Sequence, residues 1–161
     1  MRRADAAHDG LRLPAWIRRW VYLAGLACLL TGAGWLAFEY GVRIEGPFGP
    51  EAHPLQRTWL IAHGAAAMVA LWAFGLLWLA HVRRGWPRRR NRGSGGFMVG
   101  CVLALAASGW GLYYLGSEAL RPWLSAFHWV LGFLAALALP LHIALGRRHR
   151  AWRERQDTAR R

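Results

Sequence analysis

The chain of 161 residues contains no lysine, only 2 cysteines and only 8 acidic residues. The cysteines, Cys28 and Cys101, lie in separate apolar stretches, so we expect free buried thiols and no disulfide framework. The sequence also lacks a nicotinamide or flavin fingerprint, a Walker loop and a catalytic triad. It therefore gives no sign of a nucleotide-dependent enzyme or a triad hydrolase, and no stretch resembles a soluble domain.

Long apolar stretches are what the chain has instead, because 55% of its residues are hydrophobic and 11 are tryptophan. Four of these stretches approach the length of about 20 residues that crosses a bilayer, namely 20–38, 59–80, 97–115 and 123–145. Three of them open with a tryptophan, as interfacial aromatic residues often do: Trp20, Trp59 and Trp123. The sequence predicts an all-α fold, a four-helix bundle integral to a membrane and in contact with its lipid, over residues 20–146.

The distribution of arginine predicts how this domain is oriented in the membrane. The N-terminal segment 1–19, the loop after the second stretch and the C-terminal tail 147–161 carry every arginine except Arg43, Arg57 and Arg121. By the positive-inside rule, both termini and the middle loop are expected to be cytoplasmic, in a bacterial plasma membrane. The net charge of +13 then reflects the arginines of the segments expected on the cytoplasmic side. No nucleic-acid partner is expected, because these arginines flank apolar stretches and belong to no nucleic-acid-binding motif.

Four histidines fall within or at the end of the apolar stretches: His63, His81, His128 and His142. Ionisable residues inside a membrane are costly and are functional candidates by default. The spacings of 18 and 14 residues place each pair on one face of its helix, since an α-helix turns about 100° per residue. The rise per residue separates the two histidines by roughly 27 Å on the first helix and roughly 21 Å on the second.

The predicted topology places His63 and His128 at similar depth near the outer face, and His81 and His142 near the inner face. Zinc sites need three or four protein ligands, whereas each depth offers two histidines and no intramembrane acid. A haem supplies four nitrogens itself and needs only two axial ligands. We therefore expect two b-type haems, each bound by two histidines. They are expected to be non-covalent, because the covalent attachment motif C-x-x-C-H is absent.

Weaker candidates surround these pairs. Arg83, at the inner depth, and Arg121, at the outer depth, are expected to pair with haem propionates, or alternatively to face lipid headgroups. His81 lies at a helix end, so an interfacial side chain is an equally weighted alternative to a ligand there. Small residues after His63 and Gly132 after His128 are expected to leave room for the haem rings. The glycines of the first and third stretches are expected to serve ordinary helix packing.

Two segments carry a resemblance to a known family. They are "LIAHGAAAMVALWAFGLLWLAHVRRGW", Leu60 to Trp86, and "FHWVLGFLAALALPLHIALGRRHR", Phe127 to Arg150. Together, over about residues 58–148, they resemble a small bacterial dihaem cytochrome b of the cytochrome b561-like kind. Their use of two histidines from each of two helices is also similar to cytochrome b of quinol-oxidising complexes. The resemblance implies b haems ligated by His63 with His128 and by His81 with His142.

The expected function follows from two filled axial positions, which leave no open iron site and favour electron transfer over oxygen chemistry. The resemblance implies a membrane electron carrier that works between a quinone or quinol and a redox partner protein. Two alternatives stay open: a b-haem oxidoreductase that acts on a small substrate at the outer face, and a haem-free membrane scaffold or assembly subunit.

Overall fold

The computed structural model describes residues 13–88 and 92–160. Contacts divide the chain into two compact units, Met1–Arg88 and Arg89–Arg161. Each unit contains two long helices, and the helices of each unit pack against one another. Residues 1–12 of the predicted segment 1–19 lie outside the described part of the chain, whereas its last residues already belong to the first helix.

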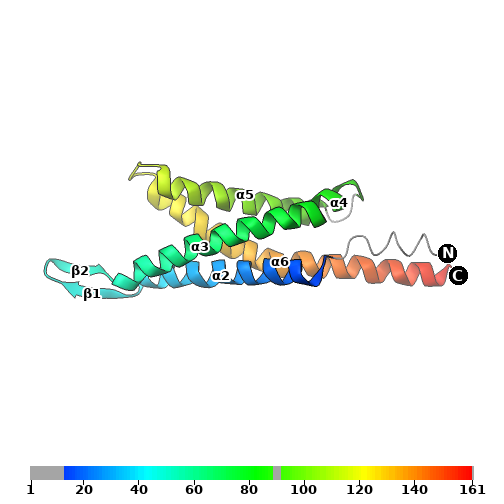
Figure 1. The fold of residues 1–161 in the computed structure, drawn as a ribbon, viewed down its shortest axis with the longest axis horizontal. Coiled ribbons are helices and arrows are strands. Elements are labelled where there is room, and N and C mark those ends of the chain that lie inside the picture. Colours follow the sequence, from blue (N-terminus) through cyan, green and yellow to red (C-terminus); the bar gives the residue numbers. More distant parts are fainter. Residues whose placement is uncertain (1–12, 89–91, 161) are drawn as a thin grey trace. The chain divides into compact units, whose positions relative to one another are not determined.

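The first unit is a helical hairpin with a small β-hairpin at its turn (Figure 1). Helix α2 covers Ala15–Tyr40 and helix α3 covers Pro54–Leu77. Strands β1, Arg43–Gly46, and β2, Gly49–Ala52, pair antiparallel between them. Gly49 has a φ of 118°, which favours glycine because side-chain-bearing residues rarely adopt it. The chain leaves α3 through three short segments, which are η1 (Trp78–Val82), α4 (Arg83–Gly85) and η2 (Trp86–Arg88).

The second unit consists of α5, Arg92–Tyr114, and α6, Arg121–Ala159. Helix α6 has 39 residues, so it runs past the predicted fourth span and through most of the basic tail 147–161. It also contains Pro140, whose ring nitrogen cannot donate a helical hydrogen bond.

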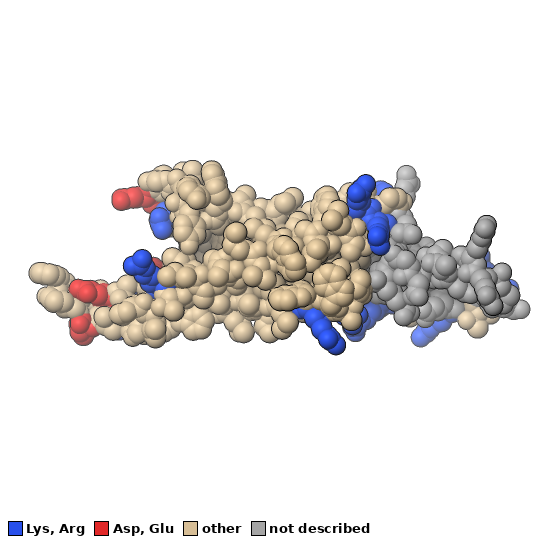
Figure 2. Space-filling view, in the orientation of Figure 1, with Lys and Arg blue, Asp and Glu red and all other residues tan. Residues whose placement is uncertain are grey.

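Within residues 13–88 and 92–160, four helical segments are long and apolar enough to cross a membrane: Ala15–Tyr40, Pro54–Gly85, Arg92–Tyr114 and Arg121–His149. Their large apolar side chains remain widely exposed, as Leu23, Met68 and Leu137 illustrate, with exposed fractions of 61%, 71% and 72%. Exposure of so much apolar surface to water is unfavourable, whereas its contact with lipid or with other membrane helices costs little free energy. On the face drawn in Figure 2, acidic side chains lie at the β-hairpin end of the first unit and the middle of its helices is uncharged. The prediction of a helical multi-pass membrane protein is confirmed, and the bundle arrangement and the cytoplasmic termini stay predictions.

Glycine allows the close packing of α2 against α3. A Cβ added at Gly34 would lie only 2.6 to 2.9 Å from three ring atoms of Trp59. Nearer the other end of the pair, the rings of Trp20 and Trp72 meet edge to face at 5.9 Å. The packing role expected for the glycines is therefore confirmed at Gly34, whereas Gly25 has no atom within 4 Å of the same added Cβ.

Two local features depart from the all-α expectation. The β-hairpin is the first, and its strands of four residues are too short to give a clear alternation in the sequence. The second is that Trp78–Val82 is a π-helix. A π-turn holds one more residue than an α-turn, so it rotates the residues in and beyond it by up to about 100°. The 18-residue spacing therefore does not by itself fix the helix face of His81 relative to His63.

Candidate functional site

His63 lies on α3 and turns its ring toward α2. Its Nδ1 atom is 3.1 Å from the hydroxyl oxygen of Thr31 and 3.1 Å from the backbone oxygen of Cys28. Gly32, next to Thr31, lies beneath the ring, because a Cβ added there would be 3.1 Å from the His63 Cε1 atom. A hydroxyl and a glycine in adjacent positions of one helix thus fix the ring of the histidine on the other.

His128 of α6 is held in the same way by α5. Its Nδ1 atom is 2.8 Å from the hydroxyl oxygen of Ser108, a residue whose exposed fraction is 4%. Gly109 follows Ser108, and a Cβ added to it would lie 3.3 Å from the His128 Cε1 atom. The arrangement of hydroxyl, glycine and histidine seen in the first unit therefore recurs in the second.

His142 repeats the arrangement once more along the same helix pair. Its Nδ1 atom lies 2.9 Å from the hydroxyl of Ser94, and Gly95 faces its Cε1 atom at 3.7 Å from an added Cβ. Ser94 and Ser108 are 14 residues apart on α5, as are His142 and His128 on α6. Equal spacings on two antiparallel helices keep both contacts in one register, so the second unit presents two histidines held alike.

The remaining predicted residues lie in less regular surroundings. His81 is partly buried within the π-helix at the end of α3. Arg83 is exposed in α4, directly after that turn, and Arg121 is exposed as the first residue of α6. Gly132 faces Leu105 of α5, with 3.9 Å between an added Cβ and that side chain, and its role in leaving room for a ring stays a prediction. The roles of Arg83 and Arg121 toward haem propionates stay predictions.

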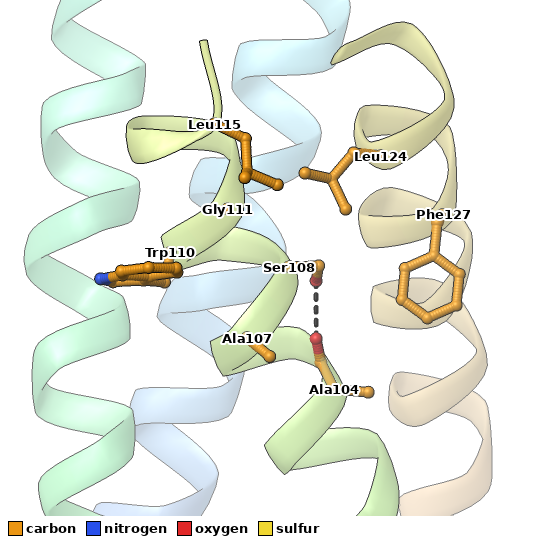
Figure 3. Close-up of a pocket in the computed structure, with 8 residues that line it drawn as sticks. All are labelled: Ala104, Ala107, Ser108, Trp110, Gly111, Leu115, Leu124 and Phe127. Carbon is orange, nitrogen blue, oxygen red and sulfur yellow. Dashed lines mark hydrogen bonds between the residues drawn. The ribbon is translucent and has the colours of Figure 1, made fainter. Parts of the chain in front are cut away.

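An apolar pocket of about 420 Å³ lies between α5 and α6, beside the Ser108–His128 contact. Its lining residues are Ala104, Ala107, Ser108, Trp110, Gly111, Leu115, Leu124 and Phe127. Figure 3 shows Leu115 and Leu124 facing one another at one end, and Ser108 with its hydroxyl turned back to the carbonyl of Ala104. The pocket beside His128 is therefore lined mainly by apolar side chains, and Ser108 contributes a hydroxyl to it.

The contacts on Nδ1 determine what the histidines can do chemically. A histidine that binds a metal through one ring nitrogen usually donates a hydrogen bond from the other, which orients the ring. With Nδ1 engaged, Nε2 is the ring nitrogen suited to bind iron in His63, His128 and His142. Among residues 13–88 and 92–160, no group of three or more His, Cys, Asp or Glu side chains could hold a metal ion.

The sequence interpretation missed the hydroxyls. Thr31, Ser94 and Ser108 are each followed by glycine, and the 14-residue repeat on α5 matches the spacing of the two histidines on α6, so a signal was available. His53, directly before α3, accepts a hydrogen bond at Nδ1 from the Leu55 amide and caps the start of that helix. The expected free thiols of Cys28 and Cys101 are confirmed.

Comparison of the chain with models of protein families, with curated proteins and with solved structures finds no match. The function of the protein must therefore be inferred from its fold and from the contacts of its histidines.

Proposed function

We propose that this protein is a dihaem b-type cytochrome of a bacterial plasma membrane, which transfers electrons between a quinone or quinol and a redox partner protein. The observation that carries the proposal is the hydrogen bond between Nδ1 of His63, His128 and His142 and a hydroxyl on the neighbouring apolar helix. Structural histidines need no such repeated arrangement, whereas axial ligands need a fixed ring orientation. The pairing of His63 with His128 and of His81 with His142 stays a prediction of the sequence.

The residues present fit a b haem by the chemistry of their donors. Imidazole nitrogen is a common axial ligand of haem iron, and two such ligands complete its coordination. The apolar lining around Ser108 and His128 suits a hydrophobic macrocycle, because burial of apolar surface is favourable. A bound b haem would supply an iron that gains and loses one electron.

The other tasks fall to residues of the chain itself. Apolar side chains of α5 and α6 line the pocket beside His128, and charge in such apolar surroundings interacts more strongly than in solution. Thr31, Ser94 and Ser108 hold the imidazole rings in one orientation. Exposed Arg83 and Arg121 have guanidinium groups suited to carboxylates at the ends of the membrane-spanning segments.

Visible absorption of the purified full-length protein tests this proposal most simply. We expect the sharp α and β bands of low-spin b haem after reduction with dithionite, and loss of intensity in His63→Ala, His128→Ala and His142→Ala. His149→Ala serves as the matched control, because His149 is exposed on α6 beyond the predicted span and should leave the spectrum unchanged. A colourless protein from haem-replete cells would contradict the proposal and favour a scaffold. Turnover of a small substrate without a partner would favour an enzyme instead.

A further inference from the structure

Backbone carbonyl groups, which can only accept, fix the direction of the hydrogen bonds around His63 and His128. A backbone carbonyl has no proton to give. The Thr31 hydroxyl lies 2.6 Å from the Ala27 oxygen and therefore donates its single proton there. Its oxygen is then left to accept a proton from Nδ1 of His63. The Cys28 carbonyl, 3.1 Å from the same Nδ1 atom, requires the same direction.

The same reasoning applies to His128. The Ser108 hydroxyl lies 2.7 Å from the carbonyl oxygen of Ala104 and 3.2 Å from that of Leu105, so its proton is directed to the α5 backbone. At 2.8 Å from Nδ1 of His128, the Ser108 oxygen must accept. In both histidines the ring proton is consequently on Nδ1, and the lone pair of the neutral ring is on Nε2.

We propose that Thr31 and Ser108 are positioning residues that fix His63 and His128 in the Nδ1–H tautomer and reserve Nε2 as the iron-binding atom. This inference rests on the proposed haem function for its purpose, although the tautomer itself can be measured with or without haem. A hydrogen bond accepted from Nδ1–H also raises the basicity of Nε2, so both residues strengthen the bond to iron.

The two acceptors of His63 make Thr31 an informative position. Nδ1 of His63 faces both the Thr31 hydroxyl and the Cys28 carbonyl. Replacement of Thr31 by valine keeps a side chain of similar shape and leaves the Cys28 carbonyl in place, so its effect on the tautomer of His63 should be limited. Replacement of Ser108 by alanine removes the hydroxyl that accepts from Nδ1 of His128.

Nitrogen-15 NMR of the full-length protein, labelled in its histidine rings and reduced in detergent micelles, tests the inference. His63→Gln and His128→Gln assign the two rings. In the wild type we expect a proton on Nδ1 of both histidines. Ser108→Ala should shift the Nδ1 proton signal of His128 and accelerate its exchange with water. Thr31→Val should change the His63 signal much less, and Thr31→Ser should restore the wild-type signal.

Haem retention supplies the second readout. Loss of an outer contact to a metal-bound histidine commonly weakens binding by about 10- to 100-fold, and we expect this for Ser108→Ala with a smaller loss for Thr31→Val. Ser125→Ala on α6 and Thr58→Val on α3 are the matched controls, since neither side chain makes a described hydrogen bond to a histidine.

A proton on Nε2 rather than Nδ1 in the wild type would overturn the inference without any variant. An unchanged His128 signal in Ser108→Ala would overturn it as well. A chain that shows the expected tautomers but binds no haem would instead contradict the proposed function and leave the tautomer assignment intact.

Discussion

The substitution Gly34→Ala tests the packing that brings α2 to the face of His63. The added Cβ would lie 2.6 Å from the nearest ring atom of Trp59, whereas ordinary contacts begin at 3.4 Å. The ring would have to move by about 0.8 Å, the difference between these two distances. Trp59 lies one helical turn before His63, so a displaced α3 would also stretch the contact of 3.1 Å between His63 and Thr31.

The energetic cost can be bounded from similar substitutions. Overpacking a close contact costs about 1–3 kcal/mol, and alanine in place of a helical glycine returns about 0.5–1 kcal/mol. We therefore expect Gly34→Ala to destabilise the protein by roughly 1 kcal/mol, the difference between the midpoints of those two ranges. Gly25→Ala on the same helix is the matched control and should be neutral or stabilising, because its added Cβ has no atom within 4 Å.

Thermal unfolding in detergent micelles, followed by circular dichroism, measures this difference. For a chain of this length 1 kcal/mol corresponds to about 2–4 °C in the melting temperature. We expect Gly34→Ala to melt roughly 2–4 °C below the wild type, by the same conversion. If Gly34→Ala melted at or above the temperature of Gly25→Ala, the close approach of α2 and α3 would be refuted.

The remaining predictions concern the haem ligands. His63→Ala and His128→Ala should deplete the same haem while His142→Ala depletes the other, as judged from low-temperature spectra; depletion of different haems by the first two variants would disprove the pairing. The haem bound by His142 should have the higher reduction potential, because arginines surround the predicted inner site and stabilise the reduced, more negative state. Potentiometric titration of wild type against His142→Ala should show loss of the higher wave, and loss of the lower wave would reverse this order.

The helices could be predicted from the sequence because each apolar stretch is long enough to dominate its local structure. Their ends could not be predicted, since hydropathy records the apolar part of a helix and not its continuation. Helix α6 shows this, because it runs through arginines as far as Ala159. The β-hairpin depends on a glycine at positive φ, Gly49, and on pairing between short strands with little apolar character.

The histidines of the candidate site were easier to predict from the sequence than the contacts that support them. Polarity inside an apolar stretch singles out His63, His128 and His142. Ser108 and Thr31 gave no comparable signal, because a hydroxyl in a membrane helix can satisfy itself by bonding to the preceding turn. His81 shows the limit of arguments from helical periodicity. The shared face of His63 and His81 was inferred from a constant rotation per residue, and the π-turn at Trp78–Val82 changes that rotation.

Haem stoichiometry tests the central claim most directly. The measurement is a pyridine haemochrome assay on full-length protein from haem-replete cells, with the chain quantified by amino-acid analysis. Two histidine pairs predict two non-covalent b haems per chain, extracted completely by acidified acetone. One haem per chain in fully loaded protein would contradict the dihaem account and identify His81 as the residue that does not bind, and no haem would contradict the proposed function as a whole.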